Sequence, residues 1–229
     1  LADHGLALAK LADEHETTIL FEAAVAGGIP VIKALREQLA ANDVTRIYGI
    51  LNGTCNYILT RMEKEGISFD DCLADAQALG YAEADPAFDI EGYDAAHKLA
   101  LLTSIAFGTE PASSEIEVDG ITRITSSDMS AADSAIASID GVTNAVAIEG
   151  DYIGSTVLQG PGAGGKATAS AVAGDVVDLA RGTEIPTFGV AASALAPFEK
   201  AQPRPDARFY LRLHVTDKAG VFAAIAGHM

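Results

Sequence analysis

The sequence predicts an α+β fold, in which helices and short strands alternate along one large domain. Apolar residues recur at helical spacing in several runs, of which YDAAHKLALLTSIAF at 93–107 is the most apolar. Between these runs lie shorter stretches rich in β-branched residues, such as RIYGILN at 46–52. Since 49% of the 229 residues are hydrophobic, the chain can bury a sizeable core. This order of elements indicates mixed α and β layers and excludes an all-α or all-β chain.

The elements of the N-terminal half follow from spacing and from capping residues. Ser68 suits an N-cap, and Gly80 and Gly108 suit the position just past a helix end. We expect, in order, a helix over 1–16, a strand over 17–21, a small-residue turn over 22–30, a helix over 31–40, a strand over 46–52, a turn over 53–56, and helices over 57–64, 70–79 and 93–107.

The C-terminal half is richer in β-type runs and in turn residues. IEVDGIT, NAVAIEG and YIGSTVLQG read as short strands between residues 115 and 160. We expect around them a polar helix near 127–138, a Gly-rich loop over 160–165, a helix over 168–181, a linker over 196–208, a strand over 209–215 and a turn over 217–220 that opens a last helix.

Charge and cysteine usage exclude several classes of partner. The 15 basic residues face 32 acidic ones, and a net charge of −17 repels nucleic acid and anionic membranes. No apolar run is long enough to span a bilayer. Cys55 and Cys72 form no CxxC or Cys/His cluster, which argues against a thiolate zinc site and a disulfide framework. We therefore expect a cytoplasmic protein.

The segment 80–98 concentrates charged residues and is the best candidate for chemistry. Asp94 and Lys98 are four residues apart, so both project from one face of the predicted helix. The neighbours of Lys98 in sequence are mostly apolar, and a nearby carboxylate would orient its amine. An ordinary ion pair on a helix surface is the alternative interpretation of this pair.

Three stretches resemble the signatures of homoserine dehydrogenases: FEAAVAGGIPVIKALRE, LNGTCNYILTRM and AQALGYAEADPAFDIEGYDAAHKLALL. They follow the family's order and spacing over roughly 17–108, and QGPGAGGKATASAVAGDVVDLA continues the resemblance more loosely. The resemblance implies an NAD(P)-dependent dehydrogenase that interconverts L-homoserine and L-aspartate 4-semialdehyde in threonine, methionine and isoleucine biosynthesis. It also implies a mixed β-sheet with helices on one face, and a homodimer.

The resemblance assigns roles to individual residues. Lys98 matches the catalytic lysine and is our candidate proton carrier, with Asp94 to orient it. Glu83 would bind the ammonium group of the substrate. Further candidates are Thr54, Tyr81 and Asp89 for substrate, and Gly80, Gly162 and Gly164 for the cofactor.

The turn over 22–30 resembles the family's site for a monovalent cation, usually sodium. The matched positions are Glu22, Val25, Gly27 and Ile29. A hard cation takes oxygen ligands, and glycines let carbonyl groups point inward. A plain structural turn is the alternative.

The Gly-rich loop supports two further interpretations. Gly160, Gly162 and Gly165 satisfy GxGxxG, the fingerprint of a Rossmann-type dinucleotide-binding domain. GPGAGGK also nearly matches the motif of a phosphate-binding loop. Ala167 stands where that loop needs Ser or Thr, and no further βα units follow Glu184. A phosphate-binding domain over 160–168 stays as a rival hypothesis.

The end of the sequence resembles the first strand and helix of an ACT domain, a small amino-acid-binding module. A non-catalytic amino-acid sensor is therefore a second rival. The domain hypothesis assigns 1–20 to the end of a Rossmann-type nucleotide-binding domain, 21–160 to the catalytic, substrate-binding and dimerisation domain, 161–195 to a return segment, 196–208 to a linker and 209–229 to a truncated ACT domain. Since most of a dinucleotide site would lie outside this sequence, we expect no appreciable dehydrogenase activity from it alone.

Overall fold

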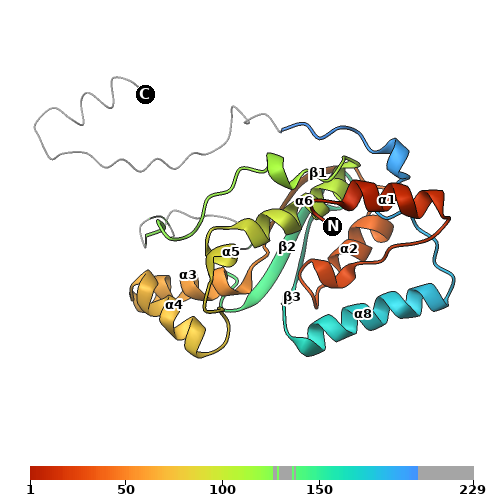
Figure 1. The fold of residues 1–229 in the computed structure, drawn as a ribbon. Coiled ribbons are helices and arrows are strands. Elements are labelled where there is room, and N and C mark those ends of the chain that lie inside the picture. Colours follow the sequence, from red (N-terminus) through yellow and green to blue (C-terminus); the bar gives the residue numbers. More distant parts are fainter. Residues whose placement is uncertain (126–127, 129–135, 137, 201–229) are drawn as a thin grey trace, which may run out of the picture.

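The computed structural model describes residues 1–125, 128, 136 and 138–200 (Figure 1). Its helices are α1 (Gly5–Glu14), α2 (Val31–Lys33), α3 (Gly53–Glu65), α4 (Phe69–Ala78), α5 (Ala87–Ile90), α6 (Tyr93–Phe107) and α8 (Gly165–Ala180). Its strands are β1 (Val44–Ile50), β2 (Thr143–Gly150) and β3 (Gly154–Pro161). Short helical turns are η1 (Glu22–Ala24), the π-helical η2 (Ala34–Gln38), η3 (Ser113–Glu115) and η4 (Ala192–Ala194).

The described strands form one three-stranded sheet in the order β1-β2-β3. β2 and β3 form a hairpin, in which Gly150 pairs with Gly154 and Thr143 pairs with Pro161. β1 lies antiparallel to β2, with Ile47 opposite Ile148. The α+β class is confirmed, but the expected mixed sheet is wrong for these residues, because both pairings are antiparallel.

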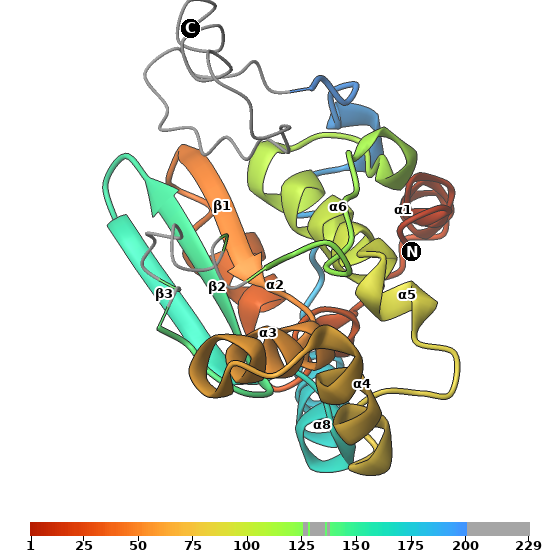
Figure 2. The same cartoon turned by 90° about the vertical axis from the view of Figure 1, so that its left-hand side faces the viewer.

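Helices α2 and α6 pack with the sheet around the main core, and Figure 2 shows the helices beside one face of the sheet. Val146 and Ile148 of β2 belong to this core, together with Ile32 of α2 and Leu102 of α6. The alternate residues Ala145 and Ala147 face the other side of the sheet, where they cluster with Tyr48 and Ile50. This alternation is the period of two that a strand imposes.

A second, smaller core supports residues 80–92, the acidic segment. Ile58 and Met62 of α3 pack against Cys72 and Ala76 of α4, and the same cluster contains Ala82 and Ile90. The acidic segment is thus anchored at both ends while its charged side chains stay outside the core. α6 starts immediately after it, at Tyr93, with Gly92 in the left-handed conformation at φ 90°.

The predicted helix boundaries hold best where a capping residue marks them. α6 spans Tyr93–Phe107 and ends at Gly108, as predicted. α4 begins after Ser68, whose side chain accepts a hydrogen bond from Asp71 N. α3 and α8 each begin a few residues earlier than predicted, at Gly53 and Gly165.

Two predicted strands are wrong. Residues 17–21 and the IEVDGIT run at 116–122 have β-type side chains but form no ladder, because no described strand lies beside either of them. The predicted helix over 31–40 is replaced by α2 and the wider π-helical turn η2. The predicted helix near 127–138 and the elements after residue 200 lie outside the described residues. Among the helices that are described, none combines the length and apolarity that a membrane crossing requires.

Candidate active site

Lys98 is held in place by two acceptors from different parts of the chain. Its Nζ donates to Asp94 Oδ2 at 2.6 Å, one helical turn earlier on α6, and to Leu51 O at 3.0 Å, just past β1. The two charged side chains are only 21% and 20% exposed, so solvent screens this pair less than a pair on an open surface. Asp94 lies in the first turn of α6, where the helix dipole stabilises a negative charge. An ammonium group has three N–H donors, so one is left for another group.

Asn52 joins the two carboxylates beside Lys98. Its Nδ2 donates to Asp89 Oδ1 at 2.7 Å and to Asp94 Oδ2 at 2.8 Å. Its Oδ1 accepts from Cys55 N at 2.9 Å, which makes Asn52 the N-cap of α3. One side chain therefore starts a helix and holds two like charges at fixed positions. Sequence reasoning missed this residue, although an Asn just before Gly53-Thr54 is a recognisable N-cap signal.

Cys55 lies beneath the same polar network but is not poised to react. Burial, followed by the negative charges of Asp89 and Asp94, raises the pKa of Cys55 to about 12. Its Sγ donates to Asp89 O at 3.3 Å. Since only the thiolate is a good nucleophile, Cys55 is a neutral packing residue at physiological pH.

A cavity of about 430 Å³ opens beside these groups. It is lined by most of the predicted site residues: Thr54, Gly80, Tyr81, Asp89, Asp94, Lys98, Gly162 and Gly164. Asn52, Gly53, Val142, Asn144, Pro161 and Ala163 complete the lining. Thr54 Oγ1 donates to Tyr81 O at 2.6 Å, which ties the start of α3 to the acidic segment.

Among the residues predicted to bind substrate, Glu83 is the one that does not line this cavity. It is exposed and is not among the lining residues, although its carbonyl oxygen accepts a hydrogen bond from Gln77 Nε2 at 2.9 Å. Between Glu83 and Asp94, the acidic residue that lines the cavity is Asp89 of α5. A role of Glu83 in substrate binding therefore stays a prediction.

The Gly-rich loop forms one wall of the cavity, between the end of β3 and the start of α8. A Cβ on Gly162 would lie 2.0 Å from Asn144 Cγ, so only glycine fits there. Gly164 has φ 106°, a conformation that favours glycine. Pro161, Gly162, Ala163 and Gly164 thus present a wall of small side chains to the cavity.

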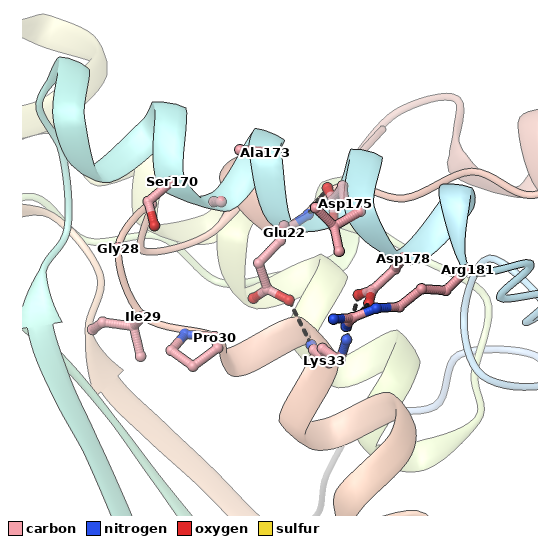
Figure 3. A pocket seen from close by; sticks show the side chains of 14 residues that line it. Glu22, Gly28, Ile29, Pro30, Lys33, Ser170, Ala173, Asp175, Asp178 and Arg181 are labelled. Atoms are coloured by element: carbon pink, nitrogen blue, oxygen red, sulfur yellow. Dashed lines mark hydrogen bonds and ion pairs between the residues drawn. The ribbon is translucent and has the colours of Figure 1, made fainter.

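A second cavity, of about 540 Å³, lies between the turn at 22–30 and α8 (Figure 3). Glu22 lines it, and its two carboxylate oxygens accept from Ile32 N at 2.9 Å and Lys33 N at 2.8 Å. Glu22 N in turn donates to Asp175 Oδ2 at 3.0 Å. Burial raises the pKa of Glu22, which the two backbone hydrogen bonds oppose. Lys33 also forms an ion pair with Asp178 of α8.

Glu22 therefore caps the start of α2, and the carbonyl groups of Val25, Gly27 and Ile29 come from the same turn. The described residues contain no cluster of three or more His, Cys, Asp or Glu side chains that suits a metal ion. A site built from one carboxylate and several carbonyl groups is a different arrangement, so the predicted cation site stays a prediction.

Fold and cavity together define an α+β domain with a lysine-centred polar pocket, walled on one side by a glycine loop. The family model for homoserine dehydrogenase matches residues 30–135 and 129–177, and the chain belongs to the homoserine dehydrogenase family.

Individual relatives agree with this assignment. The homoserine dehydrogenase of Pseudomonas aeruginosa is 41% identical over 268 residues, which cover 99% of this chain and 61% of that protein. The enzyme of Helicobacter pylori is 41% identical, with 92% of this chain and 57% of that protein covered. Among solved structures, the homoserine dehydrogenase of Thiobacillus denitrificans has a TM-score of 0.79 at 40% identity, over 85% of this chain and 54% of that one. A hyperthermophilic archaeal homoserine dehydrogenase in complex with NADPH has a TM-score of 0.73 at 32% identity, over 80% of this chain and 61% of that one.

The chain spans about 60% of the length of the curated relatives that it matches. Within the matched region the relatives are also longer. The Pseudomonas aeruginosa alignment runs over 268 residues whereas this chain has 229, so about 40 residues of the relative have no counterpart here. The family model matches the chain in two stretches, which overlap at 129–135.

Proposed function

We propose that this chain carries the substrate-binding and catalytic part of an NAD(P)-dependent homoserine dehydrogenase, which interconverts L-homoserine and L-aspartate 4-semialdehyde. The observation that carries the proposal is the placement of the Lys98 ammonium, held by Asp94 and Leu51 O at the wall of the cavity. Membership of the family supplies the substrate class.

Lys98 can manage the proton of this reaction. Reduction of the semialdehyde needs a proton at the carbonyl oxygen, and oxidation of homoserine needs one removed from the 4-hydroxyl group. In the reduction, the third N–H of the Lys98 ammonium can give its proton to that oxygen, while Asp94 and Leu51 O accept the other two N–H groups. The neutral amine that remains can take the hydroxyl proton in the oxidation. Asp89 lies in the cavity beside Asn52, and Thr54 and Tyr81 line it too. We assign these residues to substrate, and we propose Glu83, which is not among the residues that line the cavity, as the partner of the substrate ammonium.

The glycine wall suits a nicotinamide ring. A flat ring needs a surface without projecting side chains, and the wall from Pro161 to Gly164 offers one within the same cavity as Lys98. Gly80, Gly162 and Gly164 are the residues that would contact it; when bound, the nicotinamide supplies or accepts the hydride.

The domain hypothesis extends this proposal beyond the cavity. Residues 1–20 and 161–195 would belong with a Rossmann-type nucleotide-binding domain, 196–208 would be a linker, and 209–229 would begin an ACT domain. Glu22 with the carbonyl groups of Val25, Gly27 and Ile29 would bind a monovalent cation such as sodium. The enzyme would be a cytoplasmic homodimer that serves threonine, methionine and isoleucine biosynthesis.

The proposal is tested by completing the chain. We expect the 229-residue chain alone to show no dehydrogenase activity, and a fusion with the unmatched parts of the Pseudomonas aeruginosa relative to oxidise homoserine with NAD(P). Lys98→Ala should lower the turnover of the fusion by about a hundredfold or more, while Lys10→Ala, at an exposed lysine of α1, should leave it intact. Turnover by the chain alone would refute the expectation that most of the cofactor site lies outside it, and equal activity of the two variants would refute the role of Lys98.

The residues of the relative that have no counterpart in this chain need a second fusion. A version that also restores the relative's additional residues separates a loss caused by their absence from a wrong assignment of substrate. If neither fusion acts on homoserine although both fold, the proposed substrate is wrong.

A further inference from the structure

The carbonyl group of Leu51 is shared by two donors. It accepts from Lys98 Nζ at 3.0 Å and from Asn144 Nδ2, also at 3.0 Å. A carbonyl oxygen has two lone pairs, and each donor uses one of them. Leu51 joins β1 to the N-cap of α3, so its orientation also affects Asn52, the next residue.

Asn144 is clamped in the orientation that makes this contact. It lies on β2 and is 1% exposed. The backbone of Gly162 lies against its amide, and a Cβ on Gly53 would be 3.5 Å from its Oδ1. If the amide were turned over, its oxygen would face the Leu51 oxygen, and the two acceptors would repel each other.

Burial of this amide costs stability. Asn144 Oδ1 is buried and has no hydrogen-bond partner among the described residues. An unsatisfied buried acceptor destabilises the folded chain, and an apolar side chain of similar shape would avoid that cost. The residues that follow Asn144 in the strand, Ala145, Val146 and Ala147, are all apolar. A role for Asn144 must therefore come from the NH2 group of its amide, which donates to Leu51 O.

We infer that Asn144 is a positioning residue for Lys98, acting through the Leu51 carbonyl group. The inference rests on the role proposed for Lys98. Asn144 fixes the acceptor that, with Asp94, sets the direction of the Lys98 ammonium and leaves its third N–H for the cavity. Gly162 packs on the same amide, so the Asn144 side chain contacts both the glycine loop and the carbonyl group that binds Lys98. Without the amide donor, Lys98 keeps its hydrogen bond to Asp94, but Asn144 no longer fixes the orientation of the Leu51 carbonyl group that accepts its second hydrogen bond.

Two substitutions remove the donor while keeping four side-chain heavy atoms branched at Cγ: Asn144→Leu and Asn144→Asp. Ser104→Ala is the matched control, because Ser104 is a fully buried polar residue of α6, the helix that carries Lys98, and its Oγ donates to Thr109 O at 2.6 Å. The control loses one buried hydrogen bond without touching Leu51. If Asn144→Leu does not fold, Asn144→Ala replaces it.

The first measurement needs no enzymatic activity. In the 229-residue chain labelled with ¹³C at lysine Cε, Lys98 is one of seven lysines and is assigned by the signal lost in Lys98→Arg. We expect the Lys98 signal to shift or broaden in both Asn144 variants and to stay unchanged in Ser104→Ala. A Lys98 signal that is unaffected in the Asn144 variants, or equally affected in the control, overturns the inference.

The second measurement uses whichever fusion is active on homoserine. We expect kcat to fall about tenfold or more in both Asn144 variants, with KM for homoserine changed less than about twofold, since displacing a reacting group lowers turnover rather than binding. Unchanged kcat, or a loss confined to KM, contradicts the inference. An altered lysine signal together with fusions that do not oxidise homoserine would instead refute the proposed function and leave the positioning contact standing.

Discussion

Asn52 combines two tasks, and substitutions can separate them. Asn52→Ala removes the N-cap of α3 and both hydrogen bonds to Asp89 and Asp94, whereas Asn52→Ser keeps an oxygen that can cap the helix and loses the amide donor. Ser68→Ala is the matched control, because it removes a side-chain cap from α4 without touching the cavity.

The contacts set the expected magnitudes. An N-cap is worth about 1 kcal/mol, and a hydrogen bond to a charged group about 1.5–3 kcal/mol. The carboxylates of Asp89 and Asp94 can regain some water, so the lower end of that range applies. We expect the free energy of unfolding to fall by about 3–4 kcal/mol in Asn52→Ala, about 2–3 kcal/mol in Asn52→Ser and about 1 kcal/mol in Ser68→Ala.

Urea denaturation of the chain, followed by circular dichroism, measures these differences. In the active fusion, Asn52→Ser should also lower kcat, because Asp94 loses the neighbour that fixes it beside Lys98. If Asn52→Ala is no less stable than Ser68→Ala, and Asn52→Ser turns over normally, then Asn52 acts only as a cap and the reasoning about the two carboxylates is wrong.

Three further outcomes follow from the structure. Gly162→Ala should destabilise the chain by about 1–3 kcal/mol, because its Cβ would collide with Asn144. Gly174→Ala, in open space on α8, should stabilise the chain by about 0.5–1 kcal/mol. Thermal denaturation that ranks the two variants in the other order contradicts this packing. Glu22 has a raised pKa in the folded chain, so its contribution to stability should be largest at low pH and should decline as pH rises above its ordinary value of 4.5, a decline absent in Glu22→Gln; parallel pH profiles of unfolding for the two chains would exclude this. Cys55, with its pKa at about 12, should react with a thiol reagent at neutral pH about a hundredfold more slowly than in urea, and equal rates would show that it is not buried as described.

The sequence predicted best those features that depend on neighbouring residues. α6 and the Asp94–Lys98 pair follow from helical spacing and a closing glycine, and the structure has both. The strands predicted at 17–21 and 116–122 failed because strand formation depends on a partner that local composition does not reveal.

In the candidate site, too, contacts between residues close in sequence were predicted, and contacts between distant residues were not. Spacing on one helix brought Asp94 and Lys98 together, but the roles of Leu51 O and Asn144 arise from contacts between residues 47 and 93 positions apart. A backbone carbonyl has no signature in a sequence, and a single Asn in a strand indicates a buried polar contact without naming its partner. Glu83 was predicted from the resemblance, and it is not among the residues that line the cavity.

Lys98→Ala in the active fusion tests the central claim, that this amine carries the proton of the reaction. We predict that kcat falls by about a hundredfold or more, while the Kd for NADPH, measured by fluorescence titration, stays within about twofold of the unsubstituted fusion. Equal losses of turnover and of cofactor affinity would contradict the account, because Lys98 would then support binding rather than proton transfer.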